Sequence, residues 1–359
     1  MKVGIIGSGQ LGYMMINTMR RYPIEFYVID DNKGPSAFIA DKFFDVSQYK
    51  EFVDSCDYVT YEFEHIDKNI LEYADSKGKL RPSIKAVELK QDRSLEKKYL
   101  KDHGFPIADY EYAETYRDAF NKAKNFGKAV IKSCKGGYDG KNQYFIDNSS
   151  RFEEHPDIPY VVEKFIDYEY EASIIAVRDA NGKFYHFEPS FNYNQNGILI
   201  YNISPIGNTI EMIDIAKKLM DSLEYIGVMG IEYYVVDGKV IINEYAPRVH
   251  NTGHHTLTGS SISQFEEHIL AVAGMNIVRP DLFVPSGIVN IIGTDIKEKI
   301  GPVLNLGNTN IYWYHKSEVR GKRKMGHVNV YGESYNAVEQ KIREIIEILY
   351  GDRLEDFIQ

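Results

Sequence analysis

The residues with the clearest chemical potential follow a short apolar run late in the chain. Val240–Ile242 is typical of a buried strand, and it ends in Asn243 and Glu244. A strand that delivers an amide and a carboxylate to its exit end suits a hard divalent ion such as Mg²⁺, which takes oxygen ligands and shares them with phosphate. The next eleven residues contain a proline, an arginine and three histidines: Pro247, Arg248, His250, His254 and His255.

This strand is predicted to form a hairpin with the segment before it, turned at Asp237-Gly238. A two-residue turn would place Glu232 opposite Asn243, whereas a three-residue turn would place Glu232 opposite Glu244. Facing carboxylates destabilise a sheet unless a positive charge lies between them. We favour the three-residue turn, with a metal ion held by Glu232 and Glu244. Two solvated acids on an exposed hairpin are the alternative.

A glycine-rich loop opens the chain. Lys2–Gly7 is predicted to be a strand, Gly7–Gly12 a loop and Tyr13–Arg20 a helix, and a second strand, Glu25–Asp30, ends in acids. This pattern is typical of dinucleotide-binding domains, because the glycines permit a tight turn and the helix N-terminus offers free N–H groups to an anion. The same unit binds other phosphates or forms a turn without a ligand, so the pattern leaves the ligand open.

The third predicted strand, Tyr58–Glu64, also ends in acids. Open α/β sheets bind ligands at the carboxyl ends of their strands, so these acids are candidates for a ligand site. A short strand near Lys79–Arg81 is expected to close this first domain before Pro82.

The middle of the chain combines a lysine with a second glycine-rich loop. An amphipathic helix is expected over 91–100, and the predicted strand Ala129–Lys132 precedes the loop Gly136–Gln143. Such a loop can close over a triphosphate while the lysine supplies a point charge. A flexible hairpin with a surface lysine is the alternative. The segment Val161–Asp167 and Glu171 could contact adenine and ribose, but alone they predict only a pair of strands.

The composition narrows the class of protein. At 359 residues, two or three domains are expected. The net charge of −10 argues against general nucleic-acid binding. No apolar run has the length of a membrane span. Only two cysteines, Cys56 and Cys134, are present, without metal-site spacing. These features predict a reduced, cytoplasmic, multi-domain protein.

The order of Lys132, the second glycine loop, Glu163, Glu232 and Asn243-Glu244 resembles that of the ATP-grasp carboxylate–amine ligases. Within them, the chain is similar to the N5-carboxyaminoimidazole ribonucleotide synthetases over essentially its whole length. The pattern Pro-Arg-x-His-Asn-x-Gly-His at 247–254 is specific to that branch. The other matching segments are Gly7–Gly12, Tyr61–Glu64, Gln91–Arg93, Gly137–Lys141, Asn243–Ala246, Ser263–Glu266 and Arg323–His327.

The resemblance implies ATP- and bicarbonate-dependent carboxylation of the amino group of 5-aminoimidazole ribonucleotide, through carboxyphosphate, in purine biosynthesis. It implies Mg²⁺, with Mn²⁺ possible, as the metal ion. The implied partners are small molecules and a second copy of the chain in a homodimer, with no nucleic acid and no membrane.

The resemblance also implies roles for individual residues. Mg²⁺ would be held by Glu232 and Glu244. The catalytic group would be Lys132, Arg248, His250, Asn251 and His254, the last four lining the bicarbonate region. The ribonucleotide would contact Gln10, Leu11, Glu62, Tyr138, Lys141, Lys316, Arg323 and Lys324. ATP would contact Arg93, Lys132, Gly137, Tyr138, Asp139, Gly140, Lys141, Asn142, Gln143, Glu163, Lys164, Phe165, Ile166, Glu171, Asn194, Asn243 and Glu244.

Three positions depart from the family. Asn142 stands where glycine is usual, and asparagine tolerates the left-handed conformation that such a loop needs. Asn194 stands where histidine is more frequent, which puts a polar role of that side chain in doubt. His255 replaces a common tryptophan, which we interpret as a packing change.

The expected architecture combines α/β and α+β regions. A Rossmann-like N-terminal domain is expected over 1–81. The two lobes of an ATP-grasp region are expected over 82–155 and 156–285, and a β-rich C-terminal region with a final helix over 286–359. Formate-dependent glycinamide ribonucleotide transformylase, an NAD-dependent oxidoreductase and a non-catalytic nucleotide-binding protein are the competing hypotheses.

Overall fold

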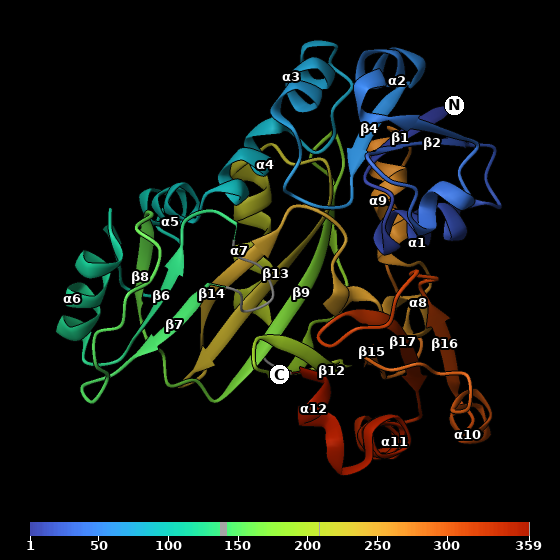
Figure 1. Ribbon diagram of the computed structural model, residues 1–359. Coiled ribbons are helices and arrows are strands. Elements are labelled where there is room, and N and C mark those ends of the chain that lie inside the picture. Colours follow the sequence, from blue (N-terminus) through green and yellow to red (C-terminus); the bar gives the residue numbers. More distant parts are fainter. Residues whose placement is uncertain (137–141, 208, 359) are drawn as a thin grey trace.

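The protein is described here by a computed structural model that covers residues 1–136, 142–207 and 209–358. Its strands form three sheets: a parallel sheet at the N-terminus, a small antiparallel sheet, and a long antiparallel sheet that continues to the C-terminal region (Figure 1). No helix of the described residues is long and apolar enough to span a membrane.

The N-terminal sheet has the strand order β3-β2-β1-β4, and all three pairings are parallel. Its strands are nearly continuous apolar runs, as expected where helices cover both faces of a parallel sheet. The elements of this region are β1 (Lys2–Ile6), α1 (Gln10–Met19), β2 (Glu25–Asp30), η1 (Pro35–Phe38), β3 (Lys42–Asp45), η2 (Val46–Gln48), α2 (Tyr49–Ser55), β4 (Tyr58–Tyr61) and α3 (Lys68–Ser76).

Three boundaries in this region differ from the predicted ones. Helix α1 begins at Gln10 instead of Tyr13, because the N–H groups of Gly9 and Gly12 donate hydrogen bonds to the carboxylate of Glu62, which directly follows β4. Strand β4 ends at Tyr61, so Glu62 and Glu64 lie on the following loop. The strand expected near Lys79–Arg81 is reduced to a single parallel bridge between Leu80 and Val59 of β4, at the predicted place.

Two helices, α4 (Ile84–Gln91) and α5 (Arg93–Asp102), lead to the small antiparallel sheet, with strand order β5-β8-β6-β7. The boundary between the two ATP-grasp lobes was expected at residue 155. Strand β8 lies after this residue in the sequence, yet it pairs with β5 and β6, which lie before it. An apolar cluster joins α6 to this sheet. The elements are β5 (Tyr110–Ala113), α6 (Tyr116–Phe126), β6 (Ala129–Ser133), β7 (Gln143–Ile146) and β8 (Tyr160–Lys164).

The long sheet has the path β14-β13-β9-β11-β12-β15-β17-β16, with β10 beside β9. Helix α7 packs on it through one apolar cluster, and α11 packs on its C-terminal strands through another. The elements before residue 286 are β9 (Tyr170–Arg178), β10 (Phe184–His186), β11 (Ser190–Gln195), β12 (Ile198–Ser204), α7 (Ile210–Ser222), β13 (Gly227–Val236), β14 (Lys239–Ala246), η3 (Asn251–Gly253), α8 (Thr256–Gly259) and α9 (Gln264–Val272).

The C-terminal strands extend the long sheet, because β15 pairs with β12 as well as with β17. The expected final helix is confirmed as α11, which Ser334 caps at its N-terminus. The elements here are β15 (Ser286–Ile292), α10 (Ile300–Asn305), β16 (Thr309–Trp313), β17 (Lys324–Tyr331), α11 (Tyr335–Tyr350), η4 (Gly351–Arg353) and α12 (Leu354–Ile358).

One apolar cluster joins the N-terminal domain to the long sheet. It contains Met15 of α1, Phe265 of α9 and Val228 of β13, all fully buried. The buried His268 adds a polar contact across the same boundary. Its Nδ1 accepts a hydrogen bond from the N–H of Val228 at 3.0 Å, so Nε2 carries the hydrogen and donates it to Thr60 Oγ1 of β4 at 2.8 Å.

The burial of His268 predicts acid-sensitive stability. Burial lowers its pKa from 6.5 to about 3, so between these values the unfolded chain binds more protons and stability falls as the pH falls. We expect His268→Gln, which takes up no proton, to reduce that fall by up to about 1.4 kcal/mol per pH unit. Urea unfolding at several pH values within this window measures the effect. His65→Gln at an exposed position is the control, and equal pH slopes in His268→Gln and the parent protein would contradict the prediction.

Candidate functional site

Two acids face each other on the β13–β14 hairpin. Glu232 is directly opposite Glu244, as predicted, but the predicted three-residue turn is wrong. The turn has two residues, Asp237 and Gly238, both with positive φ (49° and 71°). A bulge then makes Asn243 the extra residue of β14 and shifts the pairing by one. The bulge therefore creates the facing pair.

The surroundings of the two acids are strongly asymmetric. Burial, together with the charges of Glu244 and Glu171, raises the pKa of Glu232 to about 8. Burial also opposes ionisation of Glu244, but Lys90 and Arg93 hold the pKa of that carboxyl well below its usual range. Lys90 Nζ lies 3.3 Å and Arg93 Nη1 3.9 Å from Glu244 Oε2. Positive charge from α4 and α5 thus favours the ionised form of Glu244, whereas burial favours the protonated form of Glu232.

A second buried ion cluster lies between β6, β8 and α5. Glu163 is held between Lys132 at 3.0 Å and Lys97 at 2.9 Å. Burial alone would raise the pKa of Glu163, but these two ammonium groups lower it to about 2. Lys97 also donates to the carbonyl of Asn243 at 3.3 Å, which ties this cluster to the bulge.

Sequence reasoning missed Lys90, Glu96 and Lys97. Lys90 is 10% exposed, and its ammonium contacts both carboxylate oxygens of Glu96, at 3.0 and 3.1 Å, as well as Glu244. The only available signal was that Arg93 and Lys97 are four residues apart and so lie on the same face of a helix. That spacing is equally typical of a solvated helix.

The other residues predicted to contact ATP lie around these clusters. Gln143 pairs with Lys132 across β6 and β7, and Asn142 adopts the left-handed conformation (φ 57°) that its place in the loop was expected to need. Lys164, Phe165 and Ile166 end β8 and begin the next loop. Gly137, Tyr138, Asp139, Gly140 and Lys141 lie outside the described residues.

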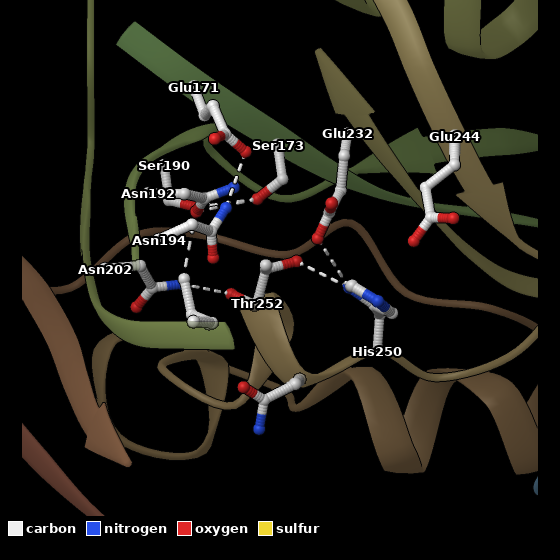
Figure 2. Close-up of polar contacts among 12 residues, drawn as sticks. Glu171, Ser173, Ser190, Asn192, Asn194, Asn202, Glu232, Glu244, His250 and Thr252 are labelled. Atoms are coloured by element: carbon white, nitrogen blue, oxygen red, sulfur yellow. Dashed lines mark hydrogen bonds and ion pairs between the residues drawn. The ribbon is translucent and has the colours of Figure 1, made fainter. Parts of the chain in front are cut away.

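Glu171 and Asn194 form one contact on neighbouring strands. Asn194 Nδ2 donates to Glu171 Oε2 at 2.5 Å, and Tyr168 Oη donates to the other oxygen at 2.8 Å. The asparagine that departs from the family thus contacts an acid predicted to bind ATP (Figure 2). The third departure, His255, is buried, and its Nδ1 lies 3.4 Å from Ser286 Oγ, as a packing role requires.

The loop after β14 brings Arg248 and His250 to the acids. Arg248 Nε forms an ion pair with Glu64 Oε1 of the N-terminal domain at 2.9 Å. His250 Nδ1 lies 3.8 Å from Glu232 Oε1 and 2.9 Å from Thr252 Oγ1 (Figure 2). Burial lowers the pKa of His250 to about 3, and the charge of Arg248 acts in the same direction. The imidazole is therefore neutral.

The other two residues predicted for the bicarbonate region differ in burial, because Asn251 is partly buried and His254 is fully buried. The side-chain amides of Asn251 and Asn290 bond each other at 2.7 and 3.1 Å. His254 is fully buried between Phe265 and His327, and Gln264 contacts its Nδ1 at 3.0 Å.

The glycine loop of the N-terminal domain is filled by the protein's own carboxylate. Gly9 and Gly12 donate their N–H groups to Glu62, the latter at 2.6 Å. Gln10 and Leu11 lie between these donors, in the first turn of α1. The cradle that a dinucleotide phosphate would need is thus occupied by Glu62, which weakens the oxidoreductase hypothesis.

Three basic residues predicted to contact the ribonucleotide lie at or before the start of β17: Lys316 and Arg323 precede the strand, and Lys324 is its first residue. Lys316 Nζ donates to the carbonyl of Lys324 at 2.6 Å, and Arg323 Nη1 donates to that of Glu318 at 2.9 Å. The charge of Lys324 acts on both Glu232 and His250. This end of β17 is therefore electrostatically connected to the acidic pair.

Comparison with known proteins agrees with this geometry. Three family models match: the ribonucleotide synthetase preATP-grasp domain over 1–91, the ATP-grasp domain over 98–265, and the phosphoribosylaminoimidazole carboxylase C-terminal domain over 286–341. The N5-carboxyaminoimidazole ribonucleotide synthase of Saccharolobus solfataricus is 47% identical over 99% of this chain and 97% of its own length. The chain belongs to the N5-carboxyaminoimidazole ribonucleotide synthase family.

Solved structures of this family have the same fold. The phosphoribosylaminoimidazole carboxylase ATPase subunit of Aquifex aeolicus is 39% identical with a TM-score of 0.86, and the match covers 97% of this chain and 100% of that one. The N5-carboxyaminoimidazole synthetase of Staphylococcus aureus, solved with ADP, is 29% identical with a TM-score of 0.89, covering 96% and 97%. The resemblance and fold class expected from the sequence are thus confirmed, and this chain is an ATP-grasp enzyme.

The buried ion cluster predicts different costs for two adjacent lysines. Lys97 is 4% exposed in its ion pair with buried Glu163, whereas Lys98 is 68% exposed in its pair with Asp102. We expect Lys97→Met to lower the free energy of unfolding by roughly 3 kcal/mol, because a buried charge loses a partner. Lys98→Met should cost less than about 1 kcal/mol. Urea unfolding of both variants tests this, and equal costs would contradict the assigned ion cluster.

Proposed function

We propose that this chain carboxylates the amino group of 5-aminoimidazole ribonucleotide with ATP and bicarbonate, giving N5-carboxyaminoimidazole ribonucleotide, ADP and phosphate in purine biosynthesis. The observation that carries the proposal is the arrangement of side chains on one continuous segment, the β13–β14 hairpin and the loop that follows it. In it, the facing acids Glu232 and Glu244 are followed by a loop that places His250 3.8 Å from Glu232 and Arg248 in an ion pair with Glu64 of the N-terminal domain.

ATP is proposed to lie between the small sheet and the long sheet. Lys132 and Lys97, already held by Glu163, provide fixed positive charge for the phosphates, and Arg93 adds a guanidinium from the start of α5. Positive groups fixed in place before the reaction stabilise developing charge without reorganisation. Glu171, held by Tyr168 and Asn194, is proposed to bind the ribose hydroxyls.

The acidic pair fits a divalent cation. The two carboxylates face each other, with side chains 15% (Glu232) and 39% (Glu244) exposed, and burial together with the charge of Glu244 raises the pKa of Glu232. Glu232 and Glu244 would hold Mg²⁺, with Mn²⁺ as a possible substitute, and the ion when bound would neutralise charge on the phosphate oxygens. Asn243 is proposed to contribute to the ATP site from the same bulge.

Bicarbonate is proposed to bind at Arg248, whose planar guanidinium suits an oxyanion. An oxygen of bicarbonate attacks the γ-phosphorus of ATP, the bond from that phosphorus to the β–γ bridging oxygen breaks, and ADP leaves. The ion pair with Glu64 fixes Arg248 before the substrate arrives. The product of this step is carboxyphosphate.

The amine of the ribonucleotide then attacks the carbonyl carbon of carboxyphosphate, or CO₂ released from it in the closed site. Phosphate leaves, and one proton leaves the amine nitrogen. The ribonucleotide is proposed to be held by Glu62, Gln10 and Leu11 at the N-terminal domain and by Lys316, Arg323 and Lys324 at its 5′-phosphate. Asn251 and His254 support the loop between these two halves.

The first experiment is ADP release from ATP with Mg²⁺. We expect strong stimulation by 5-aminoimidazole ribonucleotide that disappears when bicarbonate is removed. Glu244→Gln should lower the stimulated rate by about 10²-fold or more, whereas Glu211→Gln on the exposed surface of α7 should not. Stimulation by glycinamide ribonucleotide with formate would favour the transformylase instead. The absence of ADP under every condition would overturn the proposed reaction.

We further propose that the chain acts as a cytoplasmic homodimer. The family resemblance supports the dimer, and two free, buried cysteines, Cys56 and Cys134, are consistent with a reducing compartment. Light scattering at working concentration tests the oligomeric state, and a monomer mass would contradict the dimer.

A further inference from the structure

The side chain of Gln264, the first residue of α9, binds both the backbone N–H and the backbone carbonyl of His250. The N–H donates to Gln264 Oε1 at 2.9 Å, and Gln264 Nε2 donates to the carbonyl at 2.7 Å. Because a backbone N–H only donates and a carbonyl only accepts, these two contacts fix the orientation of the amide. The residue is fully buried, and its amide nitrogen also lies 3.0 Å from His254 Nδ1. Gln264 therefore pairs with His250 as a neighbouring strand would.

Gln264 is itself held in place, because α9 is capped and anchored at its first turn. Ser263 and Glu266 form a capping box, and the N–H of Gln264 donates to Thr256 Oγ1 at 3.0 Å. The next side chain, Phe265, is fully buried in the apolar cluster that joins the N-terminal domain to the long sheet. The amide is thus presented by a helix whose position this domain boundary determines.

The loop that carries His250 packs closely against its neighbours. A Cβ added to Gly253 would lie 2.5 Å from Gln264 Oε1, and one added to Gly230 of β13 would lie 2.5 Å from His250 Cβ. Both positions therefore need glycine, because real Cβ atoms do not approach other atoms so closely. The backbone of the loop is confined by its contacts with α9 and with β13.

Two anchors consequently hold the segment that carries Arg248. Arg248 Nε forms its ion pair with Glu64 Oε1 at 2.9 Å, and two residues later Gln264 holds the backbone at His250. A backbone N–H or carbonyl enclosed in the protein without a partner is costly, so a loop that lost the amide would move to reach other partners. Such a movement would shift His250 relative to Glu232, and Arg248 with it.

We propose that Gln264 is a positioning residue for the bicarbonate step, which holds the loop so that bicarbonate at Arg248 is aligned with the γ-phosphorus of ATP. This inference rests on the proposed carboxylation. The attack requires the reacting atoms to lie about 3–3.5 Å apart and in line, so a displaced loop slows it. Lys132 and Glu163, on the small sheet, are fixed by ion pairs of their own, so the affinity for ATP does not depend on Gln264.

The test is Gln264→Met, which keeps the length of the side chain and removes its hydrogen bonds. We expect kcat/KM for bicarbonate, measured as bicarbonate-dependent ADP release, to fall about 10²-fold. The Kd for ADP with Mg²⁺, measured by calorimetry, should match that of the parent protein. The control is Tyr160→Phe, which removes the hydrogen bond of another fully buried side chain to a backbone carbonyl, that of Pro156 at 2.6 Å. It should leave kcat/KM for bicarbonate unchanged.

A second variant, Gly253→Ala, disturbs the same amide from the loop side and replaces Gln264→Met if that variant does not fold. Its added Cβ displaces Gln264 Oε1. We expect the same pattern, a lower kcat/KM for bicarbonate with an unchanged affinity for ADP.

The outcomes separate this inference from the reaction itself. A parent protein without bicarbonate-dependent ADP release overturns the proposed carboxylation and the step assigned to Gln264 with it. With an active parent, a parent-like kcat/KM for bicarbonate in the variants overturns the role of Gln264 alone. A loss of ADP affinity as large as the loss of kcat/KM also overturns it, because the effect would then not be confined to the loop. A loss confined to kcat/KM for bicarbonate supports it.

Discussion

The opposition of Glu232 and Glu244 is the constraint on which the rest of the site depends. Two carboxylates on adjacent strands repel each other, and they remain opposed here because a bulge at Asn243 brings them into register. Lys90 and Arg93, at the ends of two consecutive helices, place positive charge beside Glu244. Positive charge thus lies within ion-pair distance of Glu244 before any ligand binds, whereas the pKa of Glu232 is raised.

The three structural regions meet at this pair because each supplies one part of its surroundings. The N-terminal domain contributes Glu64, which holds Arg248, and it is fixed to the long sheet by the α1–α9 core and by His268. The small sheet contributes Lys132 and Glu163, and helix α5 beside it contributes Lys97. The C-terminal strands continue the same sheet that carries the acids, so Lys324, the first residue of β17, is positioned by strand pairing.

The sequence predicted the elements better than the details that position the site. The strand ends, the glycine loops and the facing acids could be predicted from the sequence, because each has a local pattern of apolar, glycine or acidic residues. The bulge at Asn243 was not, since the hydrophobic pattern on either side is compatible with both registers and the wrong turn length led to the right pairing. Lys90 and Lys97 were missed because a buried lysine and a solvated one look alike in a helix that also carries exposed charges. The joining of β12 to β15 is a long-range pairing that no local pattern encodes.

The metal dependence of ADP affinity tests the central claim most directly, because it reports on the acidic pair without requiring turnover. Calorimetric titration of ADP is performed with Mg²⁺ and with EDTA, on the parent protein, Glu232→Gln and Glu244→Gln. The account predicts that removal of the cation weakens ADP binding to the parent by about tenfold or more, equivalent to about 1.4 kcal/mol, and that each glutamine variant loses most of this difference. An equally large difference in all three proteins would contradict a metal site formed by Glu232 and Glu244.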